Sequence, residues 1–244
     1  MSGVAVITGA GSGIGRAVAI ALEAAGFTAV LAGRRREALE ATARLGQGMH
    51  VVPADVTDAD SIAALFDHAA GFGRVALLFN NAGMNVAAAP LDGVAVDDIQ
   101  ALIATNVTGA MLCAREAMRI MKAQSPQGGR IINNGSVSAY APRLNAAAYT
   151  VSKHAMTGLT KALVLEGRPF GISCGQIDIG NTVTDMSERM DEGVLQADGE
   201  IRPEPRFDIE HVARTVVHMA TLPPEANISF VTIMASAMPL YGRG

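Results

Sequence analysis

The sequence predicts an α/β fold in which helices cover both faces of a doubly wound, mostly parallel sheet. Two observations support this: apolar runs alternate with helical segments along the chain, and the first run leads directly into a glycine-rich turn before a helix. The expected strands are 3–8, 27–32, 49–54, 75–79, 130–136, 171–178 and 227–234, and the expected helices are 16–25, 59–70, 96–123, 146–166 and 208–222.

Composition favours a single domain covering 1–244, because 244 residues leave little room for a second large one. Half of the residues are hydrophobic, only 17% are charged, and the mean hydropathy is +0.28. A chain this apolar is expected to cover much of its surface with helices or with other subunits.

The charge pattern argues against nucleic acid and anionic membranes as partners. The net charge is −4, and the longest basic run is Arg34-Arg35-Arg36. Apolar runs are too short to cross a bilayer, and the first strand begins too close to Met1 for a signal peptide. We therefore expect a cytoplasmic protein.

Metal binding and disulfide formation are not expected. Cys113 and Cys174 lie in apolar contexts and are interpreted as core residues. The five histidines have neither metal-ligand spacing nor a catalytic serine partner.

The glycine turn after the first strand suits a phosphate group. Its sequence is Gly9-Ala-Gly-Ser12-Gly13-Ile14-Gly15, and a helix follows. Backbone amides in such a turn, together with the helix N-terminus, attract anions. We expect these residues to hold the pyrophosphate of a dinucleotide, and a flexible connector is the alternative.

Arginines follow the second strand, at the position where a dinucleotide-binding fold contacts the ribose of the cofactor. An acid at this place would accept a hydrogen bond from the 2′-hydroxyl, but Gly33 is followed here by Arg34. A guanidinium pairs well with a 2′-phosphate. NADP(H) is therefore expected in preference to NAD(H), with Arg34 as the contact, although arginines at a helix start are also ordinary surface residues.

Two further strand ends carry small or polar residues. Asn80-Asn81-Ala82-Gly83 follows strand 75–79 and lets the backbone approach an adenosine closely. Asp55 and Val56 follow strand 49–54, where Asp55 has the alternative role of a helix cap.

Asn106 lies near the middle of the expected helix 96–123. A buried asparagine there is intrinsically disfavoured, so we expect it to bend the helix or to hold a water. A satisfied core amide is the alternative.

A candidate catalytic group lies between Ser136 and Lys153. Tyr149 and Lys153 are four residues apart in a helical segment, so one helix face should present both side chains. The lysine ammonium would stabilise the ionised phenol. Ser136, thirteen residues before Tyr149 at the tip of a strand, could hold a carbonyl oxygen that Tyr149 protonates.

These motifs together resemble the short-chain dehydrogenase/reductase family over essentially the whole chain. The resemblance implies a seven-stranded Rossmann-type sheet and reversible hydride transfer between an alcohol and a carbonyl compound. It also implies these roles: Tyr149 as acid/base, Ser136 positioning the oxygen, Lys153 also holding the nicotinamide ribose, Asn106 supporting a proton-relay water, Asp55 beside the adenine, and cofactor contacts from Val56, Asn81, Ala82 and Gly83.

The segment after the sixth strand departs from the family pattern. Ile179 stands where relatives usually have a proline before Gly180. The resemblance assigns the contact with the nicotinamide carboxamide to Thr184, with Thr182 as the second candidate. We expect this departure to alter the backbone geometry of the turn and not the binding of the cofactor.

The irregular segment 184–207 is interpreted as a substrate lid, with a surface insertion as the alternative. The apolar tail after 234 could pack on another subunit or near the substrate. Sugars, steroids, acyl thioesters and simple ketones all remain open as substrates. We also expect a homotetramer or a homodimer.

A second class of function is a non-catalytic dinucleotide-binding redox sensor. Such proteins typically lose the tyrosine or the lysine, whereas Tyr149 and Lys153 are both present here. A dehydratase or epimerase of the family's longer branch is disfavoured, because 244 residues are too few for the added substrate domain.

Overall fold

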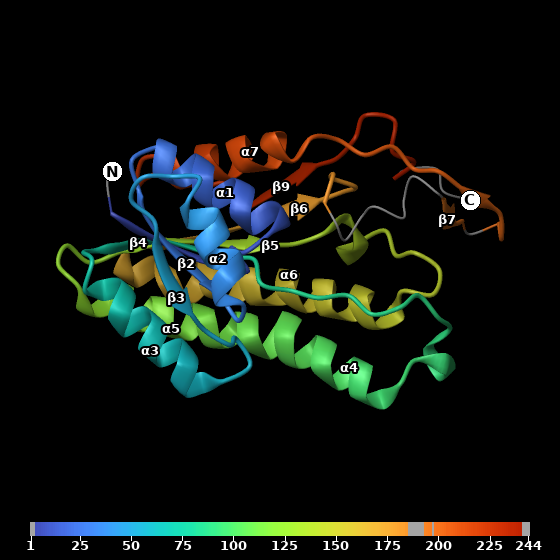
Figure 1. Ribbon diagram of the computed structural model, residues 1–244, viewed down its shortest axis with the longest axis horizontal. Coiled ribbons are helices and arrows are strands. Elements are labelled where there is room, and N and C mark those ends of the chain that lie inside the picture. Colours follow the sequence, from blue (N-terminus) through green and yellow to red (C-terminus); the bar gives the residue numbers. More distant parts are fainter. Residues whose placement is uncertain (1–2, 185–192, 197, 241–244) are drawn as a thin grey trace.

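One parallel sheet organises the molecule. A computed structural model describes residues 3–184, 193–196 and 198–240. Seven parallel strands lie in the order β3-β2-β1-β4-β5-β6-β9 (Figure 1). Their bounds are Val4–Thr8 (β1), Thr28–Gly33 (β2), His50–Pro53 (β3), Val75–Asn80 (β4), Gly129–Asn134 (β5), Ile172–Ile179 (β6) and Phe230–Ile233 (β9). The predicted fold class is confirmed.

Helices cover both faces of this sheet (Figure 1). Helices α1, α2 and α7 pack on one face, while α3, α5 and α6 pack on the other. The helix bounds are Gly13–Ala24 (α1), Arg36–Ala43 (α2), Ala59–Ala70 (α3), Val96–Ile103 (α4), Ala110–Ala123 (α5), Ala147–Gly167 (α6) and Ile209–Thr221 (α7).

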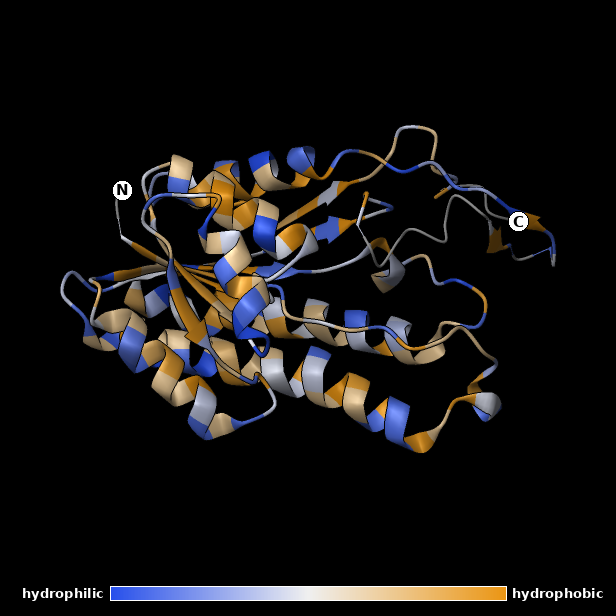
Figure 2. Ribbon diagram, viewed as in Figure 1, coloured by the Kyte–Doolittle hydropathy of each residue, from blue (hydrophilic) through white to orange (hydrophobic). Residues whose placement is uncertain are grey.

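The central strands are apolar on both faces, as the orange ribbon at the middle of Figure 2 shows. In β1, Val4 and Val6 face the core beneath α3 and α5, whereas Ala5 and Ile7 face the core beneath α1 and α7. Successive side chains of a strand point to opposite faces. An uninterrupted apolar run is therefore what a strand between two helical layers requires.

The first helix begins earlier than the sequence indicates. It starts at Gly13 rather than at residue 16, because Ser12 is extended and its carbonyl accepts the amide of Arg16 at 3.2 Å. Gly13 and Gly15 therefore belong to the first turn of α1. This places the free amides of the helix N-terminus inside the glycine turn.

The expected helix 96–123 is divided in the middle. Helix α4 passes into a π-helical turn, η2 (Ala104–Gly109), and then into α5. Asn106 lies within this turn and is buried. The local distortion anticipated around the asparagine is a widened turn.

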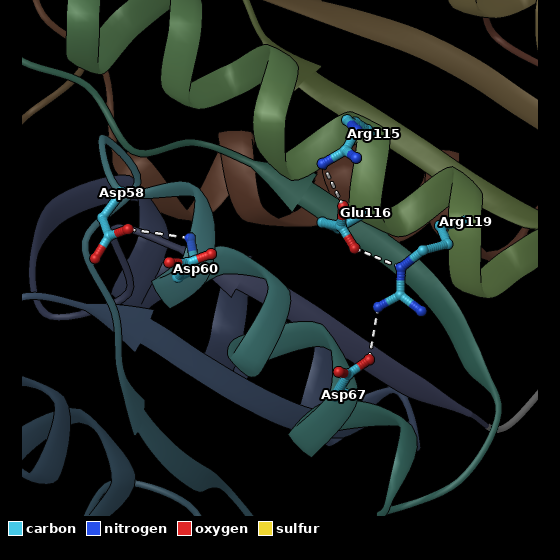
Figure 3. Close-up of polar contacts among 6 residues, drawn as sticks. All are labelled: Asp58, Asp60, Asp67, Arg115, Glu116 and Arg119. Carbon is cyan, nitrogen blue, oxygen red and sulfur yellow. Dashed lines mark hydrogen bonds and ion pairs between the residues drawn. The ribbon is translucent and has the colours of Figure 1, made fainter.

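Charged side chains join α3 to α5 on the outer surface (Figure 3). Arg119 contacts Glu116 on its own helix at 2.5 Å and Asp67 on α3 at 2.6 Å. The N-cap of α3 is Asp58, whose carboxylate accepts the amide of Asp60 at 3.0 Å. Since Asp58 caps the helix, Asp55 is not its cap residue.

The segment 184–207 is partly regular. Its described portion contains an antiparallel pair, β7 (Val194–Leu195) and β8 (Ile201–Arg202). Residues 185–192 and 197 of the predicted lid lie outside the described residues. Beyond β9, the tail packs Met238 and Leu240 against Val137 of the same chain.

Both cysteines are buried in the core, as predicted. Burial raises the pKa of each thiol to about 12. Within the described ranges, no cluster of three or more histidine, cysteine or acidic side chains could hold a metal ion. No helix among the same residues is both long and apolar enough to span a bilayer.

Candidate active site

A cavity of about 730 Å³ lies at the carboxyl ends of the central strands. This is the edge where open parallel sheets bind their ligands. All the candidate residues predicted from the sequence line this cavity: Gly9, Ser12, Gly13, Ile14, Gly15, Arg34, Asp55, Val56, Asn81, Ala82, Gly83, Asn106, Ser136, Tyr149, Lys153, Ile179, Thr182 and Thr184.

The glycine turn forms a tight backbone cradle at one end of the cavity. Gly9 has a φ of +67°, a conformation that suits glycine. A Cβ atom on Gly15 would lie only 2.3 Å from the carbonyl oxygen of Gly9. The first turn of α1 carries no acidic residue. The cradle thus fits an anionic group held by backbone amides.

Thr8 ties this cradle to the end of β4. Its hydroxyl accepts the amides of Asn81 and Ala82, both at 2.9 Å, and its carbonyl accepts the side-chain amide of Asn81 at 2.8 Å. Asn134 at the end of β5 donates to the side chain of Asn81 at 2.8 Å. Sequence reasoning missed Thr8, although its place at the end of β1 was a usable signal.

Arg34 and Asp55 lie on the wall formed by the ends of β2 and β3. The Asp55 carboxylate accepts the amide and the hydroxyl of Thr57 at 2.9 and 2.8 Å. The backbone hydrogen bond from Thr57 lowers the pKa of Asp55 most, and the guanidinium of Arg34 contributes in the same direction. Arg36, by contrast, turns to Glu40 on the outside of α2.

Tyr149 and Lys153 come from adjacent turns of α6. The Lys153 ammonium lies 5.6 Å from the centre of the Tyr149 ring and donates to the carbonyl of Asn134 at 2.9 Å. Lys153 is buried and Tyr149 is partly exposed to the cavity. This arrangement keeps a positive charge beside the phenol.

Ser136 follows β5 and begins the short 3-10 turn η3 (Val137–Ala139). Its side-chain oxygen accepts the amide of Ser138 at 3.1 Å. Among the described residues, this hydroxyl makes no hydrogen bond as a donor. Its proton is therefore available to a group in the cavity.

Asn106 joins the π-helical turn to the segment after β4. Its side-chain oxygen accepts the amide of Met84 at 2.8 Å, and its amide nitrogen donates to the Met84 carbonyl at 2.8 Å and to Ser152 at 3.3 Å. The side chain is thus a satisfied buried amide at the cavity wall, where it lies close to the helix that carries Tyr149.

The end of β6 brings the threonines to the far wall. The hydroxyl of Thr182 donates to the carbonyl of Phe207 at 3.1 Å, and a parallel bridge joins the same two residues. Thr184 lies across from the glycine turn, since a Cβ atom on Gly13 would be 3.5 Å from its methyl group. Of the two threonines, Thr184 is the nearer to the expected pyrophosphate cradle.

An ion pair at the cavity wall was not anticipated. Arg143 donates to Asn181 at 2.7 Å and to the buried carboxylate of Glu204, which also accepts from Asn181 at 2.7 Å. Arg143 and Asn181 both line the cavity. Little in the sequence indicated this contact: Arg143 is a single arginine among small residues, and Glu204 is one of seven acids in segment 184–207.

Comparisons with known proteins identify the family that this chain resembles. The sequence pattern of the family described as short chain dehydrogenase matches residues 3–194. A 3beta-hydroxysteroid dehydrogenase of Mediterraneibacter gnavus is 33% identical over 217 residues, which cover 87% of this chain and 78% of that protein. A serine 3-dehydrogenase of Agrobacterium fabrum is 31% identical over 240 residues, which cover 96% of this chain and 94% of that protein.

Two solved structures extend the comparison. An actinorhodin polyketide ketoreductase variant with NADPH has a TM-score of 0.86 at 26% identity and covers 96% of both chains. A 3-ketoacyl-(acyl-carrier-protein) reductase from Brucella melitensis complexed with NADH has a TM-score of 0.85 at 24% identity, covering 96% of this chain and 97% of that one. With a shared fold, a shared sequence pattern and full-length relatives, the chain belongs to the short-chain dehydrogenase family of oxidoreductases.

Proposed function

We propose that the protein interconverts an alcohol and the corresponding ketone or aldehyde with a nicotinamide dinucleotide. The single observation that carries the proposal is the placement of Tyr149, Lys153 and Ser136 on one cavity with the glycine cradle. The cradle suits the pyrophosphate, because it joins the N-terminus of α1, whose first turn carries no acidic side chain. When bound, the cofactor supplies or accepts the hydride.

Tyr149 is the proposed acid and base. In the reducing direction its hydroxyl gives a proton to the carbonyl oxygen, and in the oxidising direction it takes the proton back. The Lys153 ammonium stabilises the negative charge that this leaves on the phenol oxygen. Ser136 donates its unused proton to the substrate oxygen and so fixes its position.

Asn106 and Lys153 are proposed to support proton return. The Asn106 amide is fixed by Met84 and Ser152, so its place beside α6 is rigid. A water held near it could pass a proton towards Lys153, and Lys153 is also the proposed contact of the nicotinamide ribose. Thr184 is proposed to contact the carboxamide, because it lies beside the glycine turn, where a Cβ atom on Gly13 would be 3.5 Å from its methyl group.

NADP(H) is the proposed cofactor form. Arg34 and Arg35 line the cavity at the end of β2, where they would meet a 2′-phosphate. Asp55 and Val56 at the end of β3 would contact the adenine. Related structures carry NADPH in one case and NADH in another, so the preference rests on these arginines.

The substrate is proposed to be a small carbonyl compound, a sugar, a steroid or a 3-oxoacyl group. One domain carries the whole site, and 184–207 is proposed to cover the substrate. We further propose a homotetramer or homodimer, because Met111, Val151 and Leu165 on α5 and α6 are more than half exposed at 53%, 60% and 65%. Light scattering that gave the mass of one chain at micromolar concentration would contradict the assembly.

The function is tested with purified protein, NADPH and a panel of ketones from these four classes. Tyr149→Phe should abolish NADPH oxidation while NADPH binding, followed by the fluorescence of bound NADPH or by calorimetry, stays within about twofold of the wild-type value. If Tyr149→Phe turned over at the wild-type rate, the proposed role of Tyr149 would be wrong. If the wild-type protein bound NADPH tightly but reduced none of the panel, a redox sensor would replace the enzyme.

A further inference from the structure

Asp178 is a buried carboxylate that contacts the candidate active site from behind. It lies on β6 and is only 4% exposed. Its Oδ1 atom accepts the backbone amide of Ser136 at 3.0 Å and the side-chain amide of Gln176 at 2.7 Å. The proposed reaction assigns no role to this residue, which does not line the cavity.

The carboxylate lies against the backbone where β5 ends. A Cβ atom on Gly135 would be 2.1 Å from Oδ1 of Asp178, so only glycine permits this approach. The Gly135 amide also donates to the carbonyl of Ile177 at 2.8 Å. The backbone from Gly135 to Ser136 is therefore fixed by two successive hydrogen bonds to β6.

A chain of buried hydrogen bonds holds Gln176 in place. Its side-chain oxygen accepts the hydroxyl of Thr160 at 2.9 Å, and its nitrogen also donates to Thr157 at 3.1 Å. Thr160 in turn accepts from Asn133 on β5 at 2.9 Å. Each partner limits the rotation of the next, so the Asp178 carboxylate has little freedom to move.

Burying an ionised carboxylate at this place is unfavourable for the stability of the folded protein. Burial raises the pKa of Asp178, and the hydrogen bonds from Gln176 and Ser136 together with the Lys153 ammonium only partly offset that effect. A neutral side chain would avoid the cost. The carboxylate accepts the Ser136 amide and interacts electrostatically with Lys153, so it can influence both of these residues of the candidate site.

We propose that Asp178 is a positioning residue that fixes the backbone amide of Ser136 and thereby presents the Ser136 hydroxyl to the substrate oxygen. The inference rests on the proposed function. Ser136 is then held at two atoms, since Asp178 holds its amide nitrogen and the amide of Ser138 holds its side-chain oxygen. Because both of these Ser136 atoms are held in place, the hydroxyl proton can point in only a few directions.

A double-mutant cycle with Ser136 tests the inference. Asp178→Ala should lower kcat about ten- to hundredfold in the wild-type background and about twofold or less in the Ser136→Ala background, because the position of a missing hydroxyl no longer matters. Asp178→Asn keeps an acceptor oxygen and should retain kcat within about threefold. The dissociation constant for NADPH should stay the same in all variants.

An equal loss of kcat in both backgrounds would overturn the inference, as would an unchanged kcat in Asp178→Ala. Amide exchange of Ser136, followed by NMR, gives a second readout that needs no substrate. Exchange should be faster in Asp178→Ala and unchanged in Asp178→Asn; equal protection in both would also overturn the inference. Asp178→Leu, which has a similar size and no acceptor oxygen, replaces the alanine variant if that variant does not fold.

These measurements separate the inference from the proposed function. A wild-type protein that reduces no member of the ketone panel contradicts the function alone, and the exchange of the Ser136 amide then decides the role of Asp178. An active wild-type protein with additive Asp178 and Ser136 effects contradicts the inference alone.

Discussion

Arg143 and Glu204 form an ion pair that is almost closed to solvent, with side-chain exposures of 17% and 1%. Arg143 comes from the loop between Ser136 and Tyr149, whereas Glu204 comes from the segment before α7. Removing one member of a buried pair leaves the other charge buried without the opposite charge beside it, at a cost of several kcal/mol in other proteins. We therefore expect Arg143→Met to lower the free energy of unfolding by about 3 kcal/mol, measured by urea denaturation.

The double variant Arg143→Met/Glu204→Leu provides the control for this prediction. Removing both charges should recover most of the stability that the single variant loses, because no carboxylate is then buried at this place. If the double variant were as unstable as the sum of both single variants, the two side chains would act independently.

Arg34→Ala should weaken NADPH binding about tenfold and leave NADH binding unchanged, because only NADPH carries the 2′-phosphate that a guanidinium can pair with. Titration calorimetry with both cofactors measures this. Arg36→Ala is the matched control, since Arg36 pairs with Glu40 on α2 and does not line the cavity. Equal weakening by the two variants would mean that overall charge, not a specific contact, matters.

Two glycines of α6 should respond oppositely to alanine. A Cβ atom on Gly158 would meet nothing within 4 Å, whereas one on Gly167 would lie 2.4 Å from the carbonyl oxygen of Ile172. In the separated subunit, Gly158→Ala should raise the free energy of unfolding by about 0.5–1 kcal/mol through higher helix propensity. Gly167→Ala should lower it, and thermal denaturation of both variants measures the difference in sign.

Asp178→Asn should increase stability near neutral pH. The pKa of Asp178 is raised in the folded state, so the folded protein takes up a proton at higher pH than the unfolded chain does. The resulting penalty to wild-type stability is present above the folded-state pKa and disappears as the pH falls through it. The melting temperatures of wild type and variant should therefore converge on acidification, and a constant gap would contradict the prediction.

Local patterns predicted the parts of the site that lie within one segment. The four-residue spacing of Tyr149 and Lys153 on a helix, the glycine turn after β1 and the small residues after β4 all depend on neighbours in sequence. Their positions on one cavity follow, because parallel strands end at the same edge of the sheet. The sheet itself followed from the alternation of apolar runs with amphipathic segments.

Contacts between distant segments could not be predicted in the same way. Arg143 meets Glu204 across 61 residues, and Ser136 meets Asp178 across 42 residues. Nothing in the periodicity of either segment specifies such a partner. The early start of α1 was missed for a different reason: glycine is a poor helix former, yet the turn needs its small size.

The widened turn at Ala104–Gly109 has a consequence for the direction of Asn106. Cys113 and Ala117, seven and eleven residues further on, pack into the core beneath the sheet, and in an uninterrupted α-helix a residue at position 106 would share their stripe. The amide of Asn106 would then be buried among apolar side chains. The longer turn rotates α5 relative to α4, so that the apolar face of α5 packs on the sheet while Asn106 lines the candidate active-site cavity.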